Sequence, residues 1–515
     1  MRLPPGVDSL GNRGLPLVFG IGFLVRSIPE ILAFPFPIGF DTVHYAAVMN
    51  SFTVWPHWSS FFTSSWLLYA LIVPAYWLLR TDAFLLLKMV GPVLFGMNTA
   101  GIYWFARKML AWDIRWALLA GTFFSLQVSA LRISWDLLRN ELGLGLLLFT
   151  LPLVNGVGSR RGFVAFAVFS LLTVLAHEYA GVTLLVIVVA MLAWRFFGKS
   201  ASVHWARLLI GTLPALSVFI AGALLRISPI RYGAESNIIE VGDIVWGRVQ
   251  NTFFLVNYLQ VNSPVDGYAS YSSLAVSVLV LFALLYLSYL LLVVKGFFRN
   301  RVLDLWAALL LIGGFGCLFA PFCALEYWHR WLFMLVYPFT FYATNGLKRL
   351  HERGDAKGPG IHLGVPRKAV AAIGLTALLG AVYLATPVLM SSSSVGVFSV
   401  SPVSRYFSVS PTVPYGDVIS VTEAMSWLDG NMDNASCVLL HHAFLSWGKL
   451  YIRGTRAIVY FANDVYRATE CALDHGFHRV FFVWWSPDIG WYGLTVPASF
   501  SPIQSFGRIS VFELV

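Results

Sequence analysis

Hydrophobic residues recur in long blocks along most of the chain, and short polar segments separate these blocks. A block of about 20 apolar residues is long enough to cross the hydrocarbon core of a bilayer as a helix. The pattern predicts about eleven spans, at residues 15–34, 84–106, 115–134, 142–157, 162–176, 180–197, 208–225, 272–294, 302–322, 331–347 and 369–390. A further apolar run, Trp66–Leu79, would upset the alternation of loops if it crossed. Its aromatic residues suit the membrane interface, so it is predicted as a re-entrant or surface-lying helix in the first external loop.

The basic residues divide the loops between these spans into two kinds. Alternate loops are rich in Lys and Arg, as at Arg107 and Lys108 or at Lys348 and Arg349, whereas the loops between them are richer in Trp, Tyr, His and acids. Loops on the cytoplasmic side of a membrane carry the excess of Lys and Arg. The pattern therefore predicts a multi-pass plasma-membrane protein with a cytoplasmic N-terminus and an extracytoplasmic C-terminal segment.

The composition becomes more polar after residue 390, which predicts three parts: a membrane domain at 1–390, a linker at 391–415 and a small extracytoplasmic α/β domain at 416–515. Within the last part, residues 436–442, 457–461 and 479–485 are rich in β-prone residues and are predicted as strands. Residues 464–475 are predicted as a helix. The tripeptide Asn434-Ala435-Ser436 matches a glycosylation sequon on the predicted outer side.

Composition excludes several classes of protein. Of 515 residues, 58% are hydrophobic and only 12% are charged, which excludes a soluble enzyme, and 16% aromatic residues exclude a disordered chain. The net charge of +10 falls mostly in the predicted cytoplasmic loops, so no nucleic-acid partner is expected. The four cysteines form no metal signature, and whether Cys437 and Cys471 pair is left open.

Two acidic residues stand out on the predicted outer face. Asp41 follows a Gly39-Phe40 turn directly after the first span, and His44 follows one helical turn later. Asp41 is interpreted either as the N-cap of a short helix or as a carboxylate that faces a cavity, and both can hold. Asp136 lies four residues after Arg132, a spacing that suits a structural ion pair. Together, Asp41 and Asp136 could hold a divalent metal ion or divide base and positioning roles in group transfer.

Further polar candidates lie at the same face. His177 and Glu178 end the fifth span, and this pair lacks the second His of a zinc-binding helix. Glu326, His329 and Arg330 lie between the ninth and tenth spans. An Arg beside a His can bind a phosphate or diphosphate, although an aromatic belt with a snorkelling Arg gives the same pattern. Residues 226–271, which include Glu240, form a long external loop that is either a lid or substrate loop or simply a tolerated insertion.

This arrangement resembles the GT-C superfamily of membrane glycosyltransferases. The matching features are the Gly39-Phe40-Asp41 turn after the first span, the re-entrant helix, Arg107-Lys108 at the end of the next span, Asp136 in the second external loop and a soluble domain after the last span. The resemblance covers nearly the whole chain as architecture, and its sequence motifs are short.

The resemblance implies a reaction and a set of roles. The donor would be a sugar on a polyprenyl phosphate or diphosphate within the membrane, and the acceptor would be a protein, a lipid or a glycan. Asp41 would be the general base or acceptor-positioning group, with Asp136 as the second acidic residue. Departure of an anionic phosphate from a sugar carbon needs cationic anchoring more than protonation, a role for which Arg330 and its neighbour His329 are candidates.

Three alternatives remain open from the sequence. An oligosaccharyltransferase that modifies Asn is one, because Trp484-Trp485 and the residues up to Gly490 resemble a motif of that branch, and Glu240 ends a second, fainter match. A secondary transporter is another, although charges in the middle of spans are few, and the awkward ones, Arg26, Glu30 and Lys88, could pair near the membrane edge. The third is a non-catalytic scaffold whose external domain binds a partner.

Overall fold

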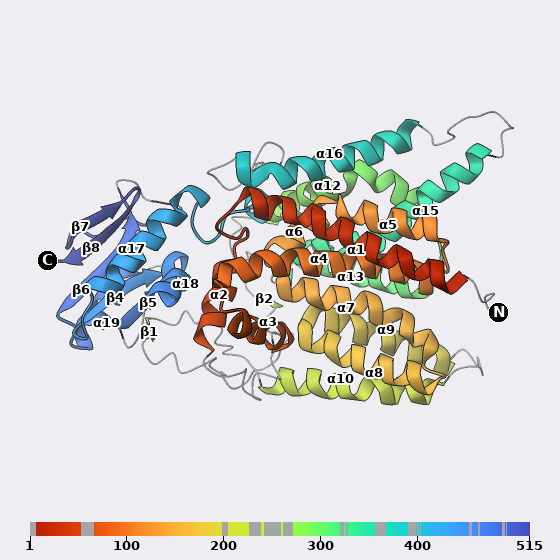
Figure 1. Cartoon of the computed structure of the whole chain (residues 1–515), viewed down its shortest axis with the longest axis horizontal. Helices are drawn as coiled ribbons and strands as arrows, with labels where there is room; N and C mark the ends of the chain where they lie inside the picture. Colours follow the sequence, from red (N-terminus) through yellow and green to blue (C-terminus); the bar gives the residue numbers. More distant parts are fainter. Residues whose placement is uncertain are drawn as a thin grey trace.

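The computed structural model describes residues 7–52, 66–197, 204–225, 238–241, 259–260, 271–319, 324–325, 328–355, 367–389, 398, 401, 403–452, 456–461, 464–486, 490 and 492–515. A bundle of long helices makes up most of the molecule, and a small α/β domain lies at one end of it (Figure 1). The N-terminus lies at the opposite end of the bundle.

The described part of each predicted span is mainly helical. The helices of the bundle are α1 (Val7–Leu32), α4 (Ala83–Lys108), α5 (Ile114–Ser125), α6 (Val128–Asp136), α7 (Leu138–Leu153), α8 (Arg160–Ala176), α9 (Glu178–Phe197), α10 (Trp205–Leu225), α12 (Tyr271–Gly296), α13 (Arg301–Phe319), α14 (Trp328–Met334), α15 (Val336–Asp355) and α16 (Arg367–Leu389). A short 3₁₀ turn, η2 (Val154–Gly156), follows α7.

The number of predicted spans is not confirmed. In the described part of the chain, six helices are long and apolar enough to cross a membrane, or seven if α5 and α6 count as one span. These two helices bend by 62° at a break. At the break, the Gln127 side chain is buried and its amide donates to Thr340 Oγ1 at 2.8 Å. A hydrogen bond of this kind makes a polar residue tolerable inside an apolar bundle.

Several helices begin at a side chain that caps them. Asp82 Oδ1 accepts hydrogen bonds from Phe84 N at 2.8 Å and Leu85 N at 3.2 Å at the start of α4. Asp113 Oδ1 accepts from Trp116 N at 3.0 Å at the start of α5. Such caps satisfy backbone N–H groups that the first helical turn leaves without partners.

Two short helices lie where the bundle meets the α/β domain (Figure 1). They are α2 (Thr42–Ser51) and α3 (Trp66–Leu79). The 14 residues of α3 reach only about 21 Å at 1.5 Å per residue, too short for a core of about 30 Å. A separate apolar helix is therefore present where one was predicted, and its packing partners are α2, α7 and α8.

The C-terminal part contains a six-stranded sheet with the order β1-β5-β4-β6-β8-β7. Its strands are β1 (Ile238–Glu240), β4 (Ser436–His441), β5 (Ala457–Phe461), β6 (Arg479–Trp485), β7 (Phe500–Phe506) and β8 (Ile509–Leu514). Strands β1, β4, β5 and β6 are parallel, while β7 and β8 form an antiparallel hairpin at one edge. The helices are α17 (Val418–Asn431), α18 (His442–Tyr451) and α19 (Val465–Asp474), after the turns η4 (Ser404–Phe407) and η5 (Tyr415–Asp417). A separate pair joins β2 (Leu259–Gln260) to β3 (Ala324–Leu325).

The α/β domain is docked firmly on the bundle through α18. The ring of Trp447 lies 6.5 Å from that of Phe36 and 5.7 Å from that of Phe84. The Tyr415 hydroxyl donates to the Ala33 carbonyl and lies 3.4 Å from the Phe36 carbonyl. One apolar core runs from the sheet into α2, α3 and α4. The α2 helix is therefore packed against both the α/β domain and the bundle.

Candidate active site

The Gly39-Phe40-Asp41 turn is fixed between two elements. Gly39 has φ +99°, and a side chain there would bring its Cβ within 2.7 Å of the Asp136 Cβ. The Gly39 N–H donates to the Val409 carbonyl at 2.8 Å, and the Gly39 carbonyl accepts from Thr42 Oγ1 at 2.6 Å. Only glycine combines this backbone conformation with so close an approach. The turn therefore holds Asp41 at a fixed place beside the end of α6.

Asp136 is the residue that holds the turn. Its side chain is 3% exposed, its Oδ1 forms an ion pair with Arg132, and its Oδ2 accepts from Phe40 N at 3.2 Å. The Arg132 Nε donates to the Tyr406 carbonyl, and its guanidinium lies 5.6 Å from the centre of the Phe333 ring. Both carboxylate oxygens of Asp136 thus have partners inside the protein, as the ion-pair interpretation predicts.

Asp41 occupies the N-cap position of α2, but its side chain makes no capping hydrogen bond. Burial raises the pKa of the Asp41 carboxyl above its usual range, and the neighbouring Asp136 charge raises it further. The guanidinium groups of Arg330, Arg139 and Arg132 act in the opposite direction. We call these five residues the Asp41 cluster, and it brings together three predicted candidates: Asp41, Asp136 and Arg330.

His329 and Arg330 lie in the first turn of α14, and both are half-buried. The His329 ring stacks on Tyr406, with centroids 4.5 Å apart and planes inclined by 30°. Trp328 packs on the same tyrosine at 5.5 Å. These contacts with Tyr406 hold the first turn of α14, which also carries Arg330, whose charge acts on Asp41.

His44 lies one turn after Asp41 on the same face of α2. Part of its surface is open to solvent, yet most of its surroundings are protein. This desolvation lowers the pKa of His44 to about 4, and the charges of Arg139 and Lys449 lower it further. The imidazole is therefore neutral near pH 7. Arg139 also lies 6.0 Å from the centre of the Tyr45 ring, which anchors it beside α2.

The remaining predicted candidates lie elsewhere. His177 ends α8, where its Nδ1 accepts from Tyr179 N at 3.1 Å, and Glu178 begins α9. Both are buried, and the His177 Cβ packs close to Gly143 of α7. Glu240 ends β1 in the sheet, paired with Tyr460. Glu326 lies outside the described residues.

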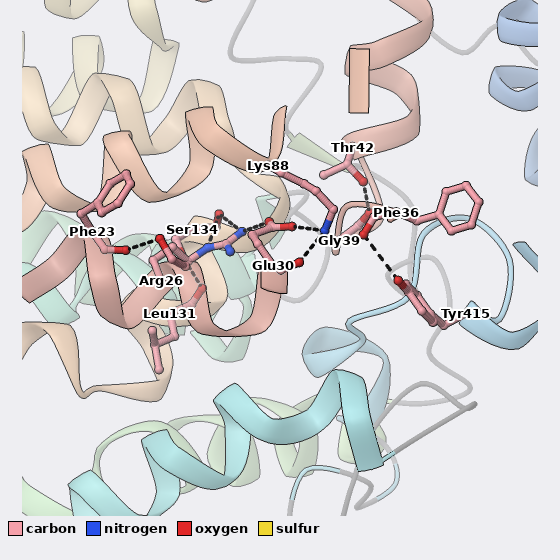
Figure 2. Close-up of polar contacts among 11 residues, drawn as sticks. Phe23, Arg26, Glu30, Phe36, Gly39, Thr42, Lys88, Leu131, Ser134 and Tyr415 are labelled. Carbon is pink, nitrogen blue, oxygen red and sulfur yellow. Dashed lines mark hydrogen bonds and ion pairs between the residues drawn. The ribbon is translucent and has the colours of Figure 1, made fainter. Parts of the chain in front are cut away.

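A second group of charges lies between α1, α4 and α6 (Figure 2). Glu30 accepts from Arg26 Nη2 at 2.8 Å and from Lys88 Nζ at 3.1 Å, and Lys88 also donates to the Glu30 carbonyl at 2.6 Å. Arg26 Nη2 donates to the Ser134 carbonyl at 3.1 Å. All three charged side chains are buried. This buried ion-pair cluster confirms that Arg26, Glu30 and Lys88 pair with one another.

The site contains functional candidates that sequence reasoning missed. Arg139 and Lys449, whose charges act on Asp41 or His44, were not predicted as site residues. One signal for Arg139 was available in the sequence. It lies in the polar first turn of α7, one turn before Gly143, and a polar turn at the start of an otherwise apolar helix indicates a site for polar contacts. Lys449 gave no signal, because its position beside α2 depends on how the α/β domain docks.

The described residues do not favour a metal ion at Asp41 and Asp136. No group of three or more His, Cys, Asp or Glu side chains in the described part of the chain could hold one. Asp136 already uses both oxygens, and three guanidinium groups act on Asp41. A cation would meet repulsion from those charges, whereas a phosphate would be attracted.

The two cysteines of the α/β domain are free thiols in this structure. Cys437 is buried in β4, and Cys471 lies on α19 with its Sγ 3.7 Å from His475 Nδ1.

Comparison with solved structures finds the same fold. The crystal structure of ArnT from Cupriavidus metallidurans bound to undecaprenyl phosphate matches 100% of this chain and 99% of its own, with a TM-score of 0.53 and 13% sequence identity. No protein-family model matches the chain, and no curated protein sequence matches it either. The likeness supports the coarse fold prediction, a mostly helical protein with several helices long and apolar enough to cross a membrane and a small C-terminal sheet.

Proposed function

We propose that this protein is a glycosyltransferase that takes a sugar from a polyprenyl phosphate or diphosphate and transfers it to an acceptor at the outer membrane face. The observation that carries the proposal is the environment of the Asp41 carboxyl. Its carboxyl takes no part in capping α2, and the charges of Arg330, Arg139 and Arg132 act on it. Such a site offers a base beside a place for an anionic leaving group.

In this proposal Asp41 is the base. The acceptor oxygen or nitrogen forms a bond to the sugar carbon, the bond from that carbon to the phosphate oxygen breaks, and the acceptor proton passes to Asp41. A raised pKa suits this role, because a carboxylate with a higher proton affinity is a stronger base. The lipid phosphate leaves as an anion, and Arg330 stabilises it through charge-assisted hydrogen bonds.

Asp136 acts in this scheme as a positioning residue. It holds Arg132 and the Phe40 N–H, and so fixes the turn that carries Asp41. His329 supports Arg330 through its stack on Tyr406. The fold likeness to a protein bound to undecaprenyl phosphate makes a polyprenyl-linked donor the natural choice.

The oligosaccharyltransferase alternative has less support. Trp484 and Trp485 are buried in the sheet, where their Nε1 atoms donate to the Leu494 carbonyl at 2.8 Å and to Asp417 Oδ2 at 2.9 Å. Their contacts are those of core residues. The transporter alternative loses its candidate Glu30, because that carboxylate is bound by two cations.

The test is transfer by the purified full-length protein in lipid, with a panel of sugars on polyprenyl phosphate and an extract of envelope acceptors. Asp41→Asn should lower the transfer rate by about 10²–10⁴-fold, the range for removal of a general base. Asp82→Asn is the matched control, because it changes an exposed carboxylate that caps α4 and Asn caps nearly as well. Equal rates for Asp41→Asn and the unchanged protein would refute the proposal.

A further inference from the structure

The buried ion-pair cluster also joins the ends of two helices (Figure 2). Arg26 donates to the Ser134 carbonyl from Nη2 at 3.1 Å and from Nε at 3.3 Å, and Ser134 lies in the last turn of α6. Lys88 Nζ donates at 2.6 Å to the carbonyl of Glu30, which lies in the last turn of α1. The last carbonyls of a helix lack partners within that helix. The two cations therefore cap the C-terminal ends of α6 and α1.

The charges of the buried ion-pair cluster match these two helix ends. Arg26 and Lys88 bring two positive charges and Glu30 brings one negative charge, so one positive charge is in excess. All three side chains are buried, where an uncompensated charge is unfavourable. The C-terminus of a helix carries roughly half a negative charge, so two of them together can balance the excess.

A glycine of α4 leaves room for the contact between Arg26 and α6. A side chain at Gly91 would bring its Cβ within 3.1 Å of Arg26 Nη2 and 3.7 Å of the Ser134 carbonyl oxygen. The same Nη2 also donates to Glu30 Oε1 at 2.8 Å. A planar guanidinium has several donors in a fixed fork and can hold both oxygens at once, whereas the ammonium of a lysine is a single compact charge.

The Gly39-Phe40-Asp41 turn lies between the two capped helix ends. It follows the end of α1 in the chain, and its Phe40 N–H donates to Asp136 Oδ2 at 3.2 Å. Asp136 is the last residue of α6, two residues after Ser134. A guanidinium that holds the Ser134 carbonyl therefore limits the movement of Asp136 and, through the Phe40 N–H, the movement of the turn.

We propose that Arg26 is a positioning residue for the transfer reaction, because it holds the end of α6 and thereby the turn that carries Asp41. This inference rests on the proposed function. Arg26 acts through Ser134 and Asp136, so its loss should lower the rate of transfer from the bound state. Donor binding should not change, because Arg330, the residue proposed to hold the donor phosphate, lies on α14.

The test compares Arg26→Lys with the unchanged full-length protein in nanodiscs. Lysine keeps the positive charge beside Glu30 but loses the fork that holds Glu30 and Ser134 together. Hydrogen exchange, measured by mass spectrometry on a peptide that spans the turn, should be about tenfold faster at the Phe40 amide, the size expected for loss of one hydrogen bond to a charged group. The kcat for transfer should fall about 10²-fold, the effect of a shift of about 1 Å at a reacting group, with an unchanged KM for the donor.

Two further variants complete the experiment. Arg160→Lys makes the same substitution at an exposed arginine at the start of α8 and should change neither exchange at the turn nor transfer. Gly91→Ala presses a methyl group against Arg26 Nη2 without changing any charge, so it should also speed exchange at the turn. Thermal denaturation shows whether each variant is folded, and Gly91→Ala decides the question if Arg26→Lys does not fold.

The outcomes separate this inference from the proposed function. Exchange at the turn that stays at the level of Arg160→Lys would overturn the inference. Faster exchange with an unchanged kcat would also overturn it, because the turn would then move without any consequence for transfer. If the unchanged protein and Asp41→Asn transfer at equal rates, the proposed function fails. Hydrogen exchange does not depend on transfer, so it still shows whether Arg26 holds the turn.

Discussion

The molecule contains two groups of charges near the same end of α1, and they differ in how their charges are used. In the buried ion-pair cluster, Arg26 and Lys88 each bind one carboxylate oxygen of Glu30, so both oxygens hold the structure together. In the Asp41 cluster, Asp136 is similarly bound by Arg132, whereas Asp41 does not even cap its own helix. The contrast separates acids that hold the structure from one that is available for chemistry.

The buried ion-pair cluster gives the largest expected change in stability. Glu30→Gln removes the carboxylate between two buried cations and should lower the free energy of unfolding by about 3–5 kcal/mol. Thermal denaturation of the purified protein, followed by tryptophan fluorescence, measures this loss. Glu423→Gln, at an exposed position on α17, is the control and should have little effect. If Glu30→Gln keeps its stability and loses only transfer, Glu30 serves the reaction rather than the structure. The proposed difference between the two clusters would then be wrong.

The Gly39 turn offers an intermediate test. Gly39→Ala places a Cβ at φ +99° against Asp136 and should cost about 1–3 kcal/mol of stability. It should also lower transfer well beyond what that stability loss explains, because Asp41 moves with the turn. Gly430→Ala, at a glycine with no atom near its would-be Cβ, is the matched control. Transfer that follows stability alone would show that the position of Asp41 is unimportant.

The smallest effect is the dependence on pH. Because burial raises the pKa of Asp41, its ionised form is destabilised in the folded protein, and this cost disappears as pH falls through the folded pKa. Asp41→Asn should therefore leave thermal stability at pH 7 unchanged or slightly higher. Transfer should decline as pH falls through a value above the usual aspartate range. His44→Gln should leave this acidic limb in place, since His44, with a pKa of about 4, is already neutral there. If the acidic decline in transfer shifts in His44→Gln, that decline is due to His44 and not to Asp41.

Much of the fold followed from hydrophobic pattern. Blocks of apolar residues located the helices of the bundle, and β-prone runs located β5 and β6 to the residue. The break between α5 and α6 was not predicted. A single Gln127 within an apolar run gives little sign of a break, because its hydrogen bond to Thr340 is formed only in the folded bundle. The strand β1 was missed because its three residues gain their partner only from β5 in the distant sheet.

The candidate site was predictable only in part. Asp41, Asp136 and Arg330 were predicted as candidates because charges are rare at a membrane edge, so each one is informative. The separation of roles between the two acids could not be predicted, since it depends on the Phe40 N–H and Arg132 that fill the oxygens of Asp136. The position of Lys449 could not be predicted either. It depends on how the α/β domain docks, and the packing of Trp447 on Phe36 and Phe84 sets that docking.

The strand β1 makes the order of synthesis matter. It is synthesised between α10 and α12, long before its neighbour β5 exists, so this strand has no partner in the sheet until the rest of the domain has been made. The bundle and the α/β domain therefore finish folding together. A chain that ends at residue 390 would leave β1 without its partner strand and expose the apolar core shared with α2. The properties of such a fragment would therefore reflect a disturbed fold of the whole protein.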